Sequence, residues 1–219
     1  MIRPALAFAA ALTVAGCASF DTLNAVATPS ELYSLTPKST FDPALPKVSE
    51  QIVVDVPTAT AAVNTDRIAV QPSPLRVQYF PVARWVDRAP LFIQTLLIES
   101  FENSEKVGAV GRSTVGLRAD YLIVTDIREF QAELPWKESD KADGEQLRAH
   151  VRLNVKIVDA FADRIVASRS FTKRKRAATE EMDDVADAFD QALGSAMRDA
   201  VEWTIQEIAA RPAPRRARF

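Results

Sequence analysis

The pattern that most constrains the fold lies near the end of the chain. From Thr179 to about Ile208, apolar side chains recur every three to four residues, which predicts a long amphipathic helix. Four acidic residues lie where the first turn should form, and the positive end of the helix dipole favours them there: Glu180, Glu181, Asp183 and Asp184. A helix of this kind buries its apolar face against another layer of structure.

Strand patterns precede this helix. Residues 151–158 alternate apolar and polar side chains, which predicts a strand with one solvent-facing side, and a tight connection leads into a partner strand at 164–173. Further strands are predicted at 31–35, 51–56, 67–71, 75–80, 107–110 and 119–131, of which 75–80 should end at Pro81. A short helical turn is predicted at 59–64, and an irregular crossing at 37–48.

A second helix is predicted from Asp87, as the N-cap, to about Asn103. Its apolar residues cover much of its circumference, so we expect it to be mostly buried. No internal repeat is visible. The predicted fold is α/β: a single compact domain over residues 31–208, with a mixed, mostly antiparallel sheet packed by two main helices.

The N-terminus reads as a processing signal over residues 1–16. One positive charge precedes an apolar run of about ten residues, which is shorter than the roughly twenty that cross a bilayer. Val14-Ala15-Gly16-Cys17 is similar to a bacterial lipobox, and Cys17 is the only cysteine in the chain. The resemblance implies acylation of Cys17, with palmitate among the usual acyl groups, and cleavage just before it. The alternative is an ordinary signal peptide with a chance cysteine.

The residues after Cys17 bear on location. Residues 17–30 are small and polar without a sustained period, so we expect a flexible tether. Ala18 takes the place of the aspartate that favours retention in the inner membrane in such lipoproteins. The resemblance therefore favours the periplasmic side of the outer membrane, its inner leaflet, over the inner membrane.

Composition excludes several functions. The 219 residues carry 27 Lys+Arg against 29 Asp+Glu, and this balance argues against nucleic-acid binding. One cysteine and one histidine, His150, cannot form a Cys/His zinc site. The six glycines form no G-x-G-x-x-G loop, and no G-x-S-x-G or H-E-x-x-H motif occurs. We therefore predict no enzyme, no cofactor and no metal, and expect His150 to be a partly exposed structural residue.

Some residues are candidate contacts with a partner or a membrane. Arg84 and Trp85 precede the first helix, and binding hot spots are rich in both types, but Trp85 could equally pack under the helix. Trp136 lies in a polar loop and could anchor a partner or pack locally. The run at 173–176 could contact an acidic partner or form a solvated strand end. The basic segment 209–219, expected to be a disordered tail, offers three more arginines: Arg215, Arg216 and Arg218.

The order of these landmarks resembles one family. Tyr33-Ser34-Leu35 follows the lipobox, Asp66 to Val70 follows a polar turn, and residues 83–87 lead into the first helix. A strand then begins at 119–123. This order is similar to that of the ABC-type transport auxiliary lipoproteins, which include the paraquat-inducible-protein-C-like lipoproteins. The resemblance implies a fold like that of the N-terminal domain of the TolB translocation protein.

The family resemblance also implies a function. It implies a non-catalytic, membrane-anchored periplasmic lipoprotein that accompanies an Mce-type lipid transporter, with an Mce-domain protein, a permease and an ATPase as partners. Self-association into a homo-oligomer stays open. The alternative function is a periplasmic lipoprotein regulator of peptidoglycan synthesis, because some activator lipoproteins share this general fold. A lipid-modifying hydrolase is disfavoured because no nucleophile motif is present.

Overall fold

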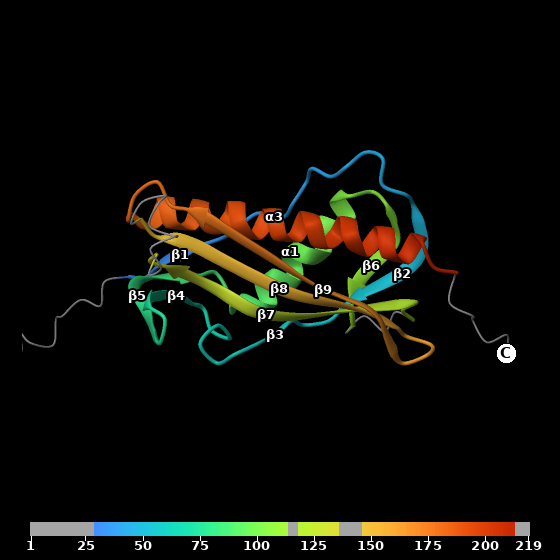
Figure 1. Ribbon diagram of the computed structural model, residues 1–219, viewed down its shortest axis with the longest axis horizontal. Helices are drawn as coiled ribbons and strands as arrows, with labels where there is room; N and C mark the ends of the chain where they lie inside the picture. The colour runs from blue at the N-terminus through green and yellow to red at the C-terminus, as the bar shows by residue number, and fades with distance from the viewer. Residues whose placement is uncertain (1–28, 114–117, 136–145, 213–219) are drawn as a thin grey trace, which may run out of the picture. The chain divides into compact units, whose positions relative to one another are not determined.

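A computed structural model describes residues 29–113, 118–135 and 146–212. The residues from Glu31 onward belong to one compact unit. Its described residues hold nine strands and two helices (Figure 1), in the order β1 (Glu31–Tyr33), β2 (Val48–Val54), β3 (Thr58–Ala59), β4 (Arg67–Ser73), β5 (Arg76–Trp85), α1 (Ala89–Asn103), β6 (Val107–Arg112), β7 (Tyr121–Glu133), β8 (Arg148–Asp159), β9 (Arg164–Arg176) and α3 (Met182–Ala209).

Strand β7 organises the sheet. On one side it pairs in parallel with β2, β3 and β4 in succession, starting at Ile52 opposite Tyr121 and reaching Gln71 opposite Glu133. On the other side it pairs antiparallel with β8, which pairs antiparallel with β9. These two antiparallel ladders are the longest in the sheet. The predicted mixed α/β domain, with two main helices, is confirmed.

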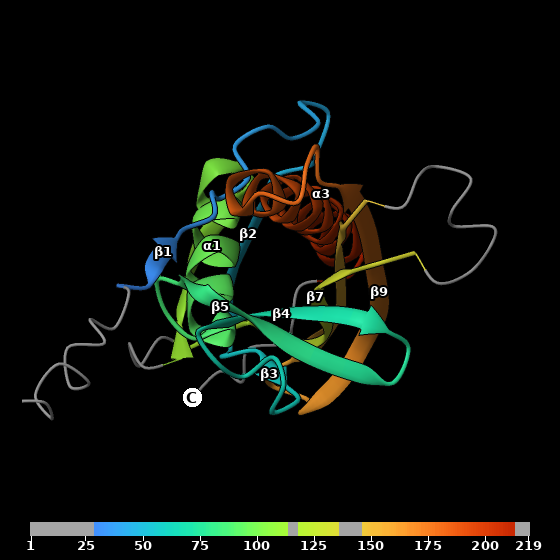
Figure 2. The same ribbon diagram turned by 90° about the vertical axis from the view of Figure 1, so that its left-hand side faces the viewer.

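The two helices cover the same face of the sheet. Viewed along the long axis, the strands curve around α3 and α1, with β9 at one side and the β4–β5 hairpin at another (Figure 2). At the centre of the core, four aromatic rings make five close pairs, with centroids 5.1 to 5.9 Å apart: Trp85, Phe92, Phe130 and Phe189. Among the described helices, none combines the length and apolar character that crossing a membrane requires.

Two local predictions are wrong. Helix α1 has Arg88 at its N-cap, with no side-chain hydrogen bond there, and Pro90 in its first turn. The carboxylate of Asp87 accepts instead from the backbone N–H of Arg88, at 2.7 Å. Strand β5 does not end at Pro81, because this proline lies where the β4–β5 register shifts and no regular ladder needs its missing N–H.

Candidate functional site

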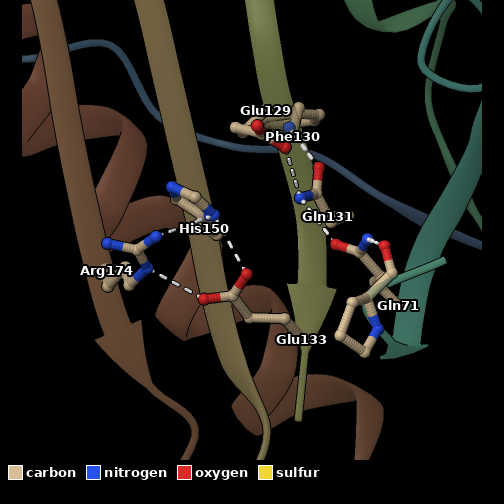
Figure 3. A network of polar contacts seen from close by, with 8 residues as sticks. Gln71, Glu129, Phe130, Gln131, Glu133, His150 and Arg174 are labelled. Atoms are coloured by element: carbon tan, nitrogen blue, oxygen red, sulfur yellow. Dashed lines mark hydrogen bonds and ion pairs between the residues drawn. The ribbon is translucent and has the colours of Figure 1, made fainter. Parts of the chain in front are cut away.

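The most developed polar cluster lies on the face of β7, β8 and β9 that points away from the helices. Glu133, on β7, accepts from two neighbours through its two carboxylate oxygens (Figure 3). His150 Nδ1 lies 3.0 Å from Oε2, and the Arg174 Nε–H group donates to Oε1 at 2.8 Å. The cluster therefore joins one residue from each of three adjacent strands.

The alternation of the strands brings these side chains together. In β8, Ala149 and Val151 point to the core, so His150 between them points to the opposite face. In the strand register, His150 lies opposite Gln131 on β7 and opposite Arg174 on β9. In β7, a register shift between Ile127 and Glu129 changes the phase of the strand. After it, Phe130 and Ala132 face the core, while Gln131 and Glu133 share the outer face with His150.

A separate set of hydrogen bonds, centred on Gln131 of β7, lies next to the cluster and reaches β4. The Gln131 side-chain amide donates to Glu129 Oε2 at 2.7 Å and to Gln71 Oε1 at 3.4 Å (Figure 3). Its own oxygen accepts from the Phe130 backbone N–H at 2.8 Å. The polar contacts thus run across four strands, from β4 to β9.

The carboxyl group of Glu133 is held as an anion. Burial alone would raise the pKa of Glu133, but the hydrogen bonds and electrostatic attraction from His150 and Arg174 outweigh it, and the pKa lies below its ordinary value. Glu133 and His150 are each 6% exposed, whereas half of the Arg174 side chain is exposed. A carboxylate paired in this way is suited to fixing three strands in register, and poorly suited to giving up or taking a proton near neutral pH.

His150 differs from its expected environment. We expected a partly exposed side chain, and the structure buries it because Glu133 and Arg174 reach it from both neighbouring strands. Its Nε2 atom is buried without a hydrogen-bond partner in the structure. Within the described ranges, no three His, Cys, Asp or Glu side chains gather into a set that could hold a metal ion.

The predicted contact pair Arg84 and Trp85 divides between surface and core. Trp85 is 2% exposed and packs against Phe92, Phe130 and Phe189, so its indole is not available to a partner and its place among contact residues is corrected. Arg84 is partly exposed, and its guanidinium pairs with Asp66 at 3.1 Å. Only Arg84 of this pair lies at the surface.

Other predicted site residues lie outside the described residues. These are the lipidation residue Cys17, the loop residue Trp136, and the tail arginines Arg215, Arg216 and Arg218. The basic run at 173–176 is described and forms the end of β9. Lys173 forms an ion pair with Asp199 on α3, and Arg174 pairs with Glu133.

Sequence reasoning missed Glu133 and Arg174 as partners of His150. The predicted strand at 119–131 stopped two residues short of Glu133, and Arg174 was read only as part of a basic run. A signal was present: His150, Asn154, Ser170 and Arg174 all occupy polar positions of alternating strands, and the structure joins Asn154 to Ser170 at 3.0 Å. Which strands are neighbours was needed to use it.

The fold and this site define a compact α/β domain whose polar cluster ties strands together. The chain belongs to the family described as the ABC-type transport auxiliary lipoprotein component, which matches residues 33–201. This is a family of transport auxiliaries and not of enzymes. The family predicted from the sequence is confirmed.

Solved structures share the fold of this chain. A crystal structure of a Xanthomonas campestris protein of family DUF330 is 31% identical, covers 83% of this chain and 98% of its own, and superposes with a TM-score of 0.75. A second crystal structure, at 11% identity and a TM-score of 0.59, covers 80% of this chain and 99% of its own, and shows the fold alone.

A curated relative extends further than this chain. An uncharacterised protein of Bradyrhizobium diazoefficiens is 29% identical over 179 residues. The match covers 80% of this chain and 45% of that protein, so the chain spans less than half of its relative's length.

Proposed function

We propose that this chain is a membrane-anchored periplasmic lipoprotein that serves as the accessory, docking component of an Mce-type ABC transporter for phospholipid or another lipid. The observation that carries the proposal is the family match over residues 33–201. In this role the protein supplies attachment and position, and the permease and ATPase subunits supply the transport energy.

Anchoring is assigned to Cys17. The lipobox-like sequence supports an acylated Cys17 as the first residue of the mature chain, and stable attachment takes more than one acyl chain. Ala18 favours the inner leaflet of the outer membrane. Residues 17–30 then tether a domain that begins near Glu31, and the Mce-domain protein is the partner that this domain reaches.

Three further contacts belong to the proposal. Trp136 is proposed as an aromatic anchor for the transporter subunit, and the arginines Arg215, Arg216 and Arg218 as contacts with anionic headgroups or an acidic partner. Arg84 stays a surface candidate whose guanidinium already pairs with Asp66. If the Trp136→Ala variant binds the partner with wild-type affinity, Trp136 is not a contact. If deletion of 211–219 leaves both liposome binding and partner pull-down unchanged at low salt, the tail is not a contact.

The first experiment is affinity purification of the full chain from membranes of its host. The proposal expects an Mce-domain protein, a permease and an ATPase in the eluate. Recovery of a peptidoglycan synthase without any transporter subunit would overturn it in favour of the regulatory alternative. Cys17→Ser is the matched variant that tests anchoring. The variant protein should be lost from the membrane fraction, and its full retention there would contradict acylation at Cys17.

A further inference from the structure

Strand β9 is an open edge of the sheet. Within the described residues it pairs only with β8, and its other side carries no strand (Figure 2). The strand is thirteen residues long, from Arg164 to Arg176, and most of its side chains are exposed. An edge of this length offers a row of backbone N–H and C=O groups to any extended chain that approaches it.

A trough lies beside this edge, between β9 and α3. One hollow of about 370 Å³ is lined by β9 residues 169–173 and by α3 residues that include Glu202, Trp203 and Gln206. A second, of about 300 Å³, is lined by Lys175 of β9 and by α3 residues 190, 191, 194 and 195, together with residues 36–39. Residues of β9 and α3 line both hollows, one further along the strand than the other, and we call the two together the trough.

The trough has room for side chains of an added strand. Phe171 and Trp203 pack edge to face with ring centroids 5.6 Å apart and form an apolar part of its lining. A methyl group added to Gly194 would meet nothing within 4 Å. Residues 169, 171, 173 and 175 lie opposite core residues of β8, so they point to the face that α3 covers. Alternate side chains of a strand added beside β9 would point to the same face.

The charge along the edge has one sign. Strand β9 carries six basic residues and no acidic one: Arg164, Arg169, Lys173, Arg174, Lys175 and Arg176. Lys173 and Arg174 have ion-pair partners, whereas in the part of the chain that the structure describes the other four have none.

The carboxylates of α3 that line the trough are already bonded inside the protein. Asp190 accepts from Thr36, Asp199 pairs with Lys173, and Glu202 accepts from the backbone N–H of Asp42. The donors to Asp190 and Glu202 are neutral groups, so these two carboxylates keep their negative charge, and only Asp199 of the three is balanced by a cation. The excess of positive charge therefore lies on β9 itself, which carries no acidic residue.

We propose that β9 is a docking strand for an extended acidic segment of a partner protein, which joins the sheet beside β9 and directs alternate side chains into the trough. The inference rests on the proposed function only for the source of the segment, a transporter subunit. A second copy of this chain is disfavoured as the occupant, because pairing two β9 strands would set six cations against six others.

The test uses the purified full chain and a fluorescent synthetic octapeptide that alternates glutamate and valine. Binding, followed by fluorescence anisotropy, should weaken with salt. Arg169→Glu and Lys175→Glu should each weaken it about tenfold. Arg76→Glu is the matched control, because Arg76 is exposed on the β4–β5 hairpin away from the trough, and it should leave affinity unchanged. If the wild-type chain does not bind the peptide, the proposal is overturned, and the role left for the basic residues is to prevent β9 from pairing with other strands.

Two modified peptides separate strand addition from attraction by charge alone. Each carries N-methyl groups on alternate residues, one set at odd and the other at even positions. A strand donates its N–H groups to one neighbour only from alternate residues, so one peptide should lose binding and the other keep it. Equal binding of both, with displacement by vesicles rich in phosphatidylglycerol, would overturn the proposal in favour of a membrane surface.

The two proposals fail separately. If transporter subunits co-purify with the full chain but the peptide does not bind, the docking strand is wrong and the proposed function stands. If the peptide binds as expected but no transporter subunit co-purifies, β9 accepts an acidic strand from another source and the proposed function is wrong.

Discussion

The two faces of the β7–β8–β9 sheet are held in opposite ways. Toward α3, strand β8 presents Val151, Leu153, Val155 and Ile157, all almost fully buried among apolar neighbours. On the opposite face the same strand presents His150 and Asn154, which are also buried but are bonded to side chains of adjacent strands. Apolar contact is non-directional, whereas a buried hydrogen bond requires a particular partner. The inner face therefore supplies most of the stability, and the outer face specifies the register.

The largest effect should come from the inner face. Trp85→Ala removes the ring that contacts Phe92, Phe130 and Phe189, and should lower the free energy of unfolding by about 3–5 kcal/mol. Urea denaturation followed by circular dichroism measures the loss. Leu75→Ala is the control, because Leu75 is fully exposed, and it should stay within about 0.5 kcal/mol. Equal losses in the two variants would contradict the assigned core.

The outer face should give a smaller loss. Glu133→Gln keeps the shape of the side chain but removes the charge that binds His150 and Arg174, so we expect a loss of about 2 kcal/mol in the same denaturation experiment. Glu102→Gln, at an exposed position near the end of α1, should change little. A Glu133→Gln protein as stable as the wild type would show that the cluster does not hold the strands.

The pH dependence should isolate the charge of Glu133. Its pKa is lowered in the folded protein, so the unfolded chain binds the proton more readily, and folding gains stability above the ordinary pKa of about 4.5. As pH falls below that value and passes through the lowered folded-state pKa, this contribution is lost. The stability difference between wild type and Glu133→Gln should therefore shrink as the pH falls below about 4.5. A difference that grows in acid would contradict the assignment.

The smallest effect should come from an exposed ion pair that lies outside both faces of the β7–β8–β9 sheet. Asp66→Asn breaks the 3.1 Å contact with Arg84, and both side chains are about 40% exposed. Solvent screens such a pair, so the expected loss is about 0.5 kcal/mol. Added salt should reduce it further. If Asp66→Asn lost as much stability as Glu133→Gln, the difference in burial between the two ion pairs would not determine how much each contributes to stability.

Local periodicity made much of the fold predictable. The helix pattern after Thr179 corresponds to α3, and the alternation at 151–158 to β8 with its one polar face. Strand β7 was harder, because the register shift after Ile127 changes which side chains face the core. The strand order could not be predicted from local sequence patterns, because β7 pairs in parallel with segments about seventy residues earlier in the chain. Ile52, for example, lies opposite Tyr121.

The candidate site was less predictable than the fold. Its three members come from three strands, and the burial of His150 depends on Glu133 and Arg174, which lie 17 and 24 residues away along the chain. A polar residue in an alternating strand normally faces solvent, so the sequence favoured exposure. The hydrogen bonds between side chains on the outer face become visible only when the neighbouring strands are known.

The central place of β7 has a consequence for how the chain acquires its structure. Strands β2, β3 and β4 are complete by Ser73, yet each of them pairs with β7, which ends at Glu133. Such long loops must close before the contacts that stabilise them exist, and this slows folding. During synthesis we expect β2, β3 and β4 to lack their partner in the centre of the sheet until β7 emerges, although β4 can already pair with β5 and β2 with β6. Among the described strands, a truncated chain that stops before Tyr121 would leave β2 and β4 with one partner each, β6 and β5, and β3 with none, and it should be a ready substrate for chaperones and proteases.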